Sequence, residues 1–314
     1  MSTVTRTLAR TALGTVAAGA TAVAYGSLIE RYAFTLRHFS VPVLPAGTDP
    51  LRVLCLSDMH LVPRQKRKIA WVQSLAETEP DLVVNTGDNL ADLAAVPYAL
   101  EALEPLLERP GVFVMGSNDY FAPKGKNPAR YLTKKHAQRK GEHQHLPTHE
   151  LIAGFESAGW INLNNRRDRV KVEGSELELI GLDDPHIKRD RYAEVAGPAD
   201  PSATLTVGVV HAPYTRALDA FVADGAQLIL AGHTHGGQLA LPFYGALVTN
   251  CDLERKRAKG VSRWWPGCAN APSEQAPDDA AWMHVSAGFG TSPYAPMRFA
   301  CRPEATLLTL TPRP

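Results

Sequence analysis

Two histidines separated by a single residue follow an apolar run late in the chain. The segment 228–238 reads Leu-Ile-Leu-Ala-Gly-His-Thr-His-Gly-Gly-Gln, so His233 and His235 come directly after a strand-like stretch. Residues i and i+2 of a regular strand point to opposite faces of a sheet. The two imidazoles can therefore converge only if the backbone leaves strand geometry, which the flanking glycines permit. We expect a loop at the carboxyl edge of a sheet, where many α/β proteins have their active sites.

Four further apolar runs end in side chains that can bind a metal. They cover residues 51–57, 81–86, 111–115 and 204–210, and they are rich in β-branched residues, as strands buried on both faces are. The side chains that follow them include Asp58, His60, Asp88, Asn118 and His211. A lone strand-end Asp is usually a turn or helix cap, and a lone buried His is usually a core residue. Five such endings in one chain favour a shared metal site.

The full set of candidate ligands combines oxygen and imidazole donors without a thiolate. Its members are Asp58, His60, Asp88, Asn118, His211, His233 and His235. Such donors favour divalent Mn, Zn, Fe, Co or Ni over a structural zinc site built from thiolates. They are too many for one ion and enough for two, provided that one carboxylate is shared. Two ions roughly 3.5–4 Å apart can hold a hydroxide between them and bind both oxygens of an in-line phosphoryl displacement.

The order and spacing of these motifs resemble the calcineurin-like metallophosphoesterase superfamily. The motifs are Asp-x-His at 58–60, Gly-Asp at 87–88, the loop 116–119, the strand-end His211 and Gly-His-x-His at 232–235. The apolar N-terminus, the Gly-Gly-Gln at 236–238 and the tail 298–304 are similar to the small membrane-associated bacterial branch of that superfamily. The resemblance implies a four-layer α/β sandwich, in which two mixed β-sheets lie face to face with helices outside. Segments 68–78 and 149–157 are suited to form such helices.

The resemblance also implies a function and a role for each candidate residue. The function is hydrolysis of phosphate mono- or diesters, lipid-linked or nucleotide-like esters among them, by a hydroxide that bridges two metals. Asp58, His60, Asp88 and His235 would hold the first ion. Asp88 would bridge to a second ion held by His211, His233 and an amide from the loop 116–119. The candidate catalytic residues are Asp88, Asn118, Asp119 and His211, and Arg298 is a candidate contact for the substrate phosphate.

One loop departs from the family pattern Gly-Asn-His-Asp, because residues 116–119 read Gly-Ser-Asn-Asp. Aligned column by column, Ser117 replaces the amide ligand and Asn118 replaces the imidazole. Aligned with a slip of one residue, Asn118 keeps the ligand role and the imidazole is missing. We favour Asn118, since an amide carbonyl binds a hard dication better than a serine hydroxyl does. In both alignments the loop lacks an acid for the leaving group, a contribution typically worth 10²–10⁴-fold, so we expect a preference for esters with good leaving groups.

Two other functions are alternatives to general phosphoester hydrolysis. A nuclease of the same superfamily is disfavoured by the net charge of +1 and by the lack of an extended aromatic and basic surface, so no nucleic-acid partner is expected. A membrane-tethered protein that binds metal and headgroups without cleaving them is the remaining alternative. Its support is the altered loop at Ser117 and Asn118.

The N-terminus suggests a membrane location. Residues 11–29 carry no charge and follow Arg6 and Arg10; as a helix they would span about 28 Å, close to the thickness of a bilayer core. The segment is either an uncleaved anchor, which we favour, or a signal peptide cut near residues 22–24. The basic residues before it predict a catalytic domain outside the cytoplasm. We therefore expect an anchor or signal segment at 1–30, a linker or edge segment at 31–47 and a catalytic domain at 48–314.

Two local features bear on partners and compartment. Residues 124–140 contain seven Lys and Arg residues and no acidic one, so they form either a solvated surface insertion or a platform for anionic lipid headgroups or a polyphosphate. Cys55 is expected in the core, whereas Cys251 and Cys268 would pair only in an oxidising compartment. The sequence leaves the oligomeric state open.

Overall fold

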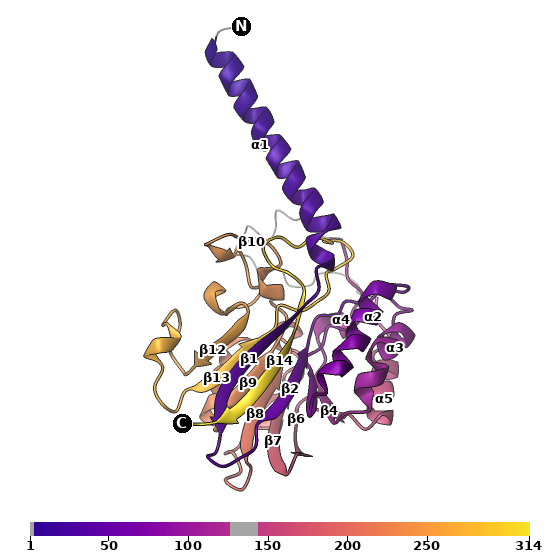
Figure 1. The fold of residues 1–314 in the computed structure, drawn as a ribbon. Coiled ribbons are helices and arrows are strands. Elements are labelled where there is room, and N and C mark those ends of the chain that lie inside the picture. The colour runs from indigo at the N-terminus through magenta and orange to yellow at the C-terminus, as the bar shows by residue number, and fades with distance from the viewer. Residues whose placement is uncertain (1–2, 126–143) are drawn as a thin grey trace.

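Two six-stranded mixed β-sheets form the centre of the computed structural model, which describes residues 3–125 and 144–314 (Figure 1). The strand order of the first sheet is β1 (Thr35–Leu44), β14 (Glu304–Pro312), β2 (Leu51–Leu56), β3 (Leu82–Asn85), β4 (Gly111–Phe113) and β5 (Ile161–Asn162). Neighbours in this sheet are parallel except β14 and β2. The segment 31–47, expected as a linker or edge segment, thus contains an edge strand.

The second sheet has a parallel centre and antiparallel edges. Its order is β12 (Gly260–Trp264), β13 (Ala281–Val285), β9 (Leu228–Ala231), β8 (Leu205–Val210), β7 (Ser175–Leu182) and β6 (Arg166–Val172). Only the pairs β12 with β13 and β6 with β7 are antiparallel. A separate two-stranded hairpin consists of β10 (Ala240–Leu241) and β11 (Gly245–Ala246).

Helices cover the outer faces of both sheets. The α-helices are α1 (Thr3–Leu28), α2 (Lys66–Ser74), α3 (Val96–Leu107), α4 (Ser117–Tyr120), α5 (Thr148–Ser157) and α6 (Thr215–Ala223). The 3₁₀ helices are η1 (Glu30–Tyr32), η2 (Leu75–Thr78), η4 (Pro185–Ile187), η5 (Tyr192–Glu194), η6 (His235–Gly237), η7 (Arg255–Arg257) and η8 (Ser273–Gln275). Helices α2, α3 and α5 pack on the first sheet, and α6 packs on the second. This arrangement confirms the predicted four-layer sandwich.

The alternation of side chains along each central strand explains why these runs are apolar throughout. In β2, Val53 and Cys55 point into the layer between the sheets, whereas Leu54 and Leu56 point towards the helices. Because both faces of the strand are covered, neither set of positions tolerates a polar residue. The predicted strands at 51–57, 81–86, 111–115, 204–210 and 228–230 all form, within one or two residues of their expected ends.

The N-terminal helix α1 projects from one end of the sandwich (Figure 1). The stretch Arg10–Tyr32 is long and apolar enough to cross a membrane, and little of it is buried. The foot of α1 is bound to the domain: the Gly26 carbonyl accepts a hydrogen bond from the Arg298 amide, and the buried Glu30 carboxylate accepts hydrogen bonds from the amides of Ala300 and Cys301.

The structure tests the pairing of the cysteines but not the predicted basic platform. All four cysteines are buried free thiols, so Cys251 and Cys268 do not form a disulfide in this structure. Residues 126–140 of the predicted basic platform lie outside the described residues.

Candidate metal centre

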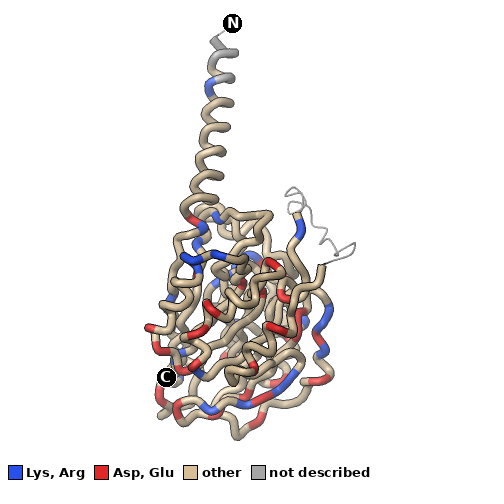
Figure 2. Tube along the Cα trace, turned by 90° about the vertical axis from the view of Figure 1, so that its right-hand side faces the viewer, with Lys and Arg blue, Asp and Glu red and all other residues tan. Residues whose placement is uncertain are grey.

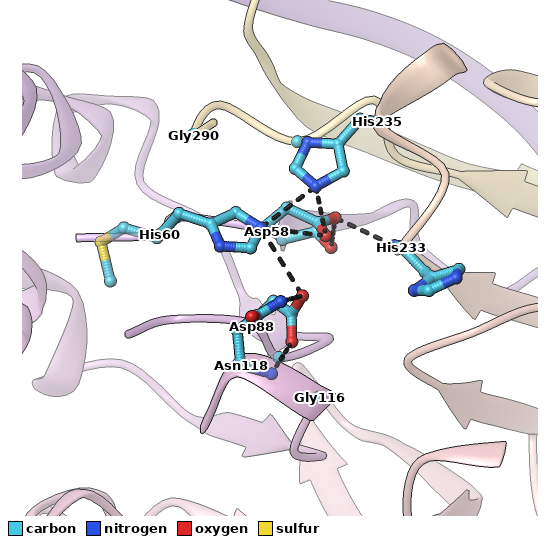
Figure 3. A network of polar contacts seen from close by, with 12 residues as sticks. Asp58, His60, Asp88, Gly116, Asn118, His233, His235 and Gly290 are labelled. Carbon is cyan, nitrogen blue, oxygen red and sulfur yellow. Dashed lines mark hydrogen bonds and ion pairs between the residues drawn. The ribbon is translucent and has the colours of Figure 1, made fainter. Parts of the chain in front are cut away.

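The carboxyl ends of five parallel strands bring the candidate ligands together (Figure 3). Asp58 and His60 follow β2, Asp88 follows β3 and Asn118 lies in α4, just after β4. In the second sheet, His211 follows β8, and His233 and His235 follow β9. Because β2, β3 and β4 are neighbours, as are β8 and β9, the two sheets present their loops to one common space.

The backbone leaves strand geometry at most of these positions, as expected for the Gly-His-x-His loop. Five candidate ligands have positive φ values: Asp58 (52°), His60 (42°), Asp88 (56°), His233 (68°) and His235 (51°). A non-glycine residue in this left-handed region is strained, and such strain concentrates at functional sites. The turns in the chain rotate side chains that a straight strand would send to opposite faces towards one point.

A first group of ligand atoms comes from Asp58, His60 and His235. His235 Nε2 lies 3.4 Å from Asp58 Oδ1 and 3.1 Å from His60 Nε2. The other oxygen of Asp58, Oδ2, accepts hydrogen bonds from the hydroxyl of Ser57 and from the backbone amide of His233. The protein therefore fixes one oxygen of this carboxylate and presents the other to two imidazoles.

A second group comes from Asp58, Asp88 and His211, so Asp58 belongs to both groups. Asp88 Oδ2 lies 3.5 Å from His60 Nε2 and 3.5 Å from His211 Nε2, and thus stands between one imidazole of each group. His233 Nδ1 lies 3.3 Å from His211 Nε2 and extends the second group. Six of the seven predicted ligands contribute a ring nitrogen or a carboxylate oxygen to this cluster. The seventh, Asn118, contacts the cluster through Asp88.

Contacts behind the imidazoles of His211 and His233 direct one ring nitrogen of each towards the cluster. His211 Nδ1 lies 2.7 Å from the Thr86 carbonyl and must donate to it, which leaves Nε2 as the inward-facing atom. His233 is turned the other way round, because its Nε2 faces the Asn250 carbonyl and its Nδ1 faces the cluster. Second contacts of this kind are typical of metal-binding histidines, whose ring orientation they fix.

The cluster has the charge properties of a cation site. Burial raises the pKa of Asp58 to about 6, with nearby Asp88 adding to the effect while His211 opposes it. Burial lowers the pKa of His60 to about 4 and the pKa values of His233 and His235 well below their usual range, so these rings are neutral at pH 7. Neutral imidazoles and ionised carboxylates are the forms that bind metals.

Asp88 and His211 form a buried pair of opposite charges. Burial alone would raise the pKa of Asp88, but the positive charge of His211 holds it well below its usual range. Burial alone would lower the pKa of His211, but the negative charge of Asp88 holds it well above its usual range.

Asp58 Oδ1 is buried without a hydrogen-bond donor among the described residues. A buried carboxylate oxygen of this kind is costly unless a cation is bound, so the donor set fits divalent metals.

Two predicted site residues lie behind the cluster. The buried Asp119 carboxylate accepts hydrogen bonds from the amides of Asp88, Asn89 and Gly116, and so holds the loops after β3 and β4 in place. The guanidinium of Arg298 is fully buried; it donates to the carbonyls of Ala287 and Gly290 and lies 3.3 Å from His235 Nδ1. Both side chains are thus committed to protein groups.

The sequence did not predict the contacts that Ser57, Gly232 and His186 make at the site. Ser57 orients Asp58, and Gly232 is required beside it because a Cβ at that position would lie 1.8 Å from the Ser57 hydroxyl. The ring of His186 lies 4.5 Å from that of His233. A signal for His186 existed, since it follows β7, the strand next to β8, but its Asp-Asp-Pro-His context also fits an ordinary turn.

Comparison with known proteins agrees with the geometry. Residues 51–237, more than half of the chain, match the family model of the calcineurin-like phosphoesterases. The chain is 28% identical over 297 residues to the uncharacterized protein YpbG of Bacillus subtilis, covering 92% of this chain and 90% of that one. It is 26% identical over 295 residues to an uncharacterized metallophosphoesterase of Aquifex aeolicus, with 90% and 94% covered.

A third relative has an activity in its name. The chain is 25% identical over 266 residues to the phosphodiesterase YaeI of Escherichia coli, covering 83% of this chain and 82% of that one. The family match extends from the loop of Asp58 to the loop of His235 and includes every candidate metal ligand. The chain therefore belongs to the calcineurin-like phosphoesterase family and is a metal-dependent phosphoesterase.

Proposed function

We propose that this enzyme hydrolyses phosphate esters with two divalent ions held side by side between the sheets. The observation that carries the proposal is the pair of ligand groups that share Asp58, with Asp88 Oδ2 equidistant from an imidazole of each group. Asp58, His60, Asp88 and His235 would hold one ion. Asp88, His211, His233 and Asn118 would hold the other. The mixture of oxygen and nitrogen donors suits Mn, Zn, Fe, Co or Ni.

Bound ions would supply Lewis acidity, which lowers the pKa of water and polarises the phosphoryl oxygens. The protein supplies orientation. Ser57 and the His233 amide fix one oxygen of Asp58, Asp119 fixes the backbone of Asp88, and the Thr86 carbonyl fixes His211. These supports lie on buried loops at strand ends, so the cluster keeps its shape when a substrate arrives.

Asn118 occupies the position at which the loop after β4 meets Asp88. Its side-chain amide contacts Asp88 Oδ2, whereas Ser117 is the buried first residue of α4. This placement supports the alignment in which Asn118 takes the ligand role and the loop lacks an imidazole. Arg298, behind His235, is better suited to position that ligand than to contact the substrate phosphate.

We further propose that residues 1–30 anchor the enzyme in a membrane, with the catalytic domain outside the cytoplasm. The length and apolar surface of α1 support this placement. The catalytic domain would include β1 in addition to residues 48–314, because β1 pairs with β14 from Thr35 to Leu44.

The test is metal reconstitution of the full chain purified in detergent. After chelation, Mn, Zn, Fe, Co and Ni are restored one at a time, and bound metal and turnover of bis-nitrophenyl and nitrophenyl phosphate are measured together. We expect two ions per chain and activity that follows their binding. The Asp88→Asn variant should bind less metal, and its activity should fall on the order of 10³-fold. Asp168→Asn, on β6, is the matched control. One ion per chain at full activity would contradict the dinuclear proposal.

A further inference from the structure

A cavity of about 530 Å³ lies at the foot of α1, outside the metal centre. Its lining residues come from η1 and Phe34, from residues 62–65 and the first turn of α2, and from the loop 289–296. Ligand pockets of roughly 300–1,000 Å³ accommodate molecules much larger than a single phosphate ion. None of the candidate metal ligands lines this cavity.

The cavity has a strong excess of positive charge. Its cationic lining residues are Arg31, Arg64, Lys66, Arg67 and Lys68, and no acidic residue of the described part of the chain lines it. Within residues 3–125 and 144–314, none of these cations forms an ion pair with a carboxylate. Figure 2 shows basic segments gathered near the end of α1 that joins the domain. Lys68 contributes less than a full charge at pH 7, because burial, together with the charges of Arg298 and Arg31, lowers its pKa to about 7.

Such a concentration of unpaired positive charge attracts an anion. Arginine and lysine donate hydrogen bonds and accept none, and arginine suits phosphate oxygens especially well. The nearby carboxylate of Glu30 is directed away from these cations, since it accepts hydrogen bonds from the amides of Ala300 and Cys301 and forms no ion pair with the lining cations. The cationic lining is therefore suited to an anionic group such as a phosphate diester.

Apolar residues line the cavity beside these cations, and the guanidinium groups of Arg31 and Arg67 lie over the Tyr32 ring, 4.4 Å and 5.7 Å from its centroid. Tyr32, Phe34 and Phe289 line it together with Pro293 and Pro296. A ligand that matches both kinds of lining residue combines an anionic group with hydrocarbon.

The position of the cavity identifies the source of such a ligand. Arg31 and Tyr32 are the last residues of the stretch Arg10–Tyr32, so a bilayer around α1 would place them at its headgroup level. The β10–β11 hairpin lies at the same end of the molecule (Figure 1), and its tip exposes Leu241, Phe243 and Tyr244. Exposed apolar tips beside a membrane span indicate that this end of the domain faces lipid.

We propose that this cavity binds the anionic headgroup and adjoining chain segment of a membrane phospholipid. The site relies on α1 lying in the membrane and is independent of the metal chemistry. It shares a wall with the metal centre: Lys68 Nζ donates to the Met59 carbonyl, and the Gly290 amide donates to the Asp58 carbonyl. A bound lipid therefore lies directly behind the loop that carries Asp58 and His60.

The test measures lipid adducts on the full chain in a nonionic detergent by native mass spectrometry. Phosphatidylglycerol, zwitterionic phosphatidylcholine and inorganic phosphate are compared. We expect one tightly bound phosphatidylglycerol, and about tenfold weaker binding in the Arg64→Gln/Arg67→Gln variant, because both exposed arginines line the cavity. The control is Arg169→Gln/Lys171→Gln, which removes two exposed charges from β6 and should bind as the wild type does.

The remaining outcomes overturn the proposal. Equal binding of phosphatidylcholine, unchanged binding by the cavity variant, or displacement of the lipid by millimolar inorganic phosphate would each exclude an anionic-lipid site. A photoreactive phosphatidylglycerol should label residues 62–68 and 289–296; labelling confined to α1 would identify only lipid that surrounds the span. Repeating the titration in Asp88→Asn separates the two proposals, since lipid should bind even where hydrolysis is lost.

Discussion

Asn118 donates two hydrogen bonds to Asp88, one from its backbone amide to Oδ1 and one from its side-chain amide to Oδ2, each 2.6 Å long. The loop after β4 is thus joined to the carboxylate that stands between His60 and His211. In the family pattern to which this loop is similar, an imidazole stands beside the leaving group. Here the corresponding short helix, Ser117–Tyr120, contains no histidine.

The Asn118→His variant tests the consequence for leaving groups. Without an acid in the loop, we expect the wild-type kcat/KM to fall steeply as the leaving group becomes more basic. A histidine at this position should reduce that dependence, raising alkyl-ester turnover by roughly 10-fold or more relative to nitrophenyl esters. Rates for a series of phenyl and alkyl phosphates, measured at saturating metal, give the two slopes. Asn118→Ala serves as the control, and equal slopes in all three proteins would contradict the idea.

Arg298 should act on metal binding through His235. Replacing it with Met removes the contact with His235 Nδ1 and leaves the Ala287 and Gly290 carbonyls without their donor. Loss of such a supporting contact typically weakens metal affinity by about 10–100-fold. We expect activity to recover at high metal concentration, with kcat near the wild-type value. Arg302→Met, an exposed position in the same tail, is the control. A lower kcat that excess metal does not restore would instead indicate contact with the substrate.

The ligand set and the layer architecture were predictable because their signals are local. Each ligand directly follows an apolar run, and a run that is apolar at every position is buried on both faces. The ends of neighbouring parallel strands then meet without further information. Asp58, Asp88 and His211 converge for this reason, although more than 150 residues separate the first from the last.

The supporting residues were not predictable because their partners come from distant segments. Arg298 was predicted to contact the substrate phosphate, but its side chain is buried between His235 and the carbonyls of Ala287 and Gly290. Glu30 directly follows the uncharged segment 11–29, and its carboxylate accepts hydrogen bonds from the amides of residues 300 and 301. No spacing rule connects such positions. Only the packing of α1 and the C-terminal loop on the sandwich brings them together.

The N-terminal span should remain on the mature protein. The foot of α1 packs tightly on the C-terminal loop, since a Cβ on Gly26 would lie 2.5 Å from the Arg298 carbonyl oxygen. We expect the full-length mass in the membrane fraction after alkaline extraction, and protease digestion of the domain in intact spheroplasts. A shorter, extractable protein beginning near residue 25 would instead identify a signal peptide. Protection of the domain from protease would place it in the cytoplasm.

His284 should make the fold sensitive to acid. It is buried on β13, and neither ring nitrogen has a hydrogen-bond partner among the described residues. Burial lowers its pKa to about 4, below the value of about 6.5 in an unfolded chain. Between these values the unfolded chain binds a proton that the folded protein does not. The free energy of unfolding therefore decreases as the pH falls from about 6.5 to 4.

The His284→Leu variant removes this proton linkage. We compare the free energy of unfolding of the variant with that of the wild type at each pH. The variant's value relative to the wild type should be about 2 kcal/mol higher at pH 5 than at pH 8. Denaturant unfolding at both pH values, at constant metal, measures the change. The exposed His38 on β1 provides the control, because His38→Leu leaves the buried ring in place and should keep the wild-type acid sensitivity. If the stability difference between His284→Leu and the wild type is the same at both pH values, the ring is not held neutral by burial.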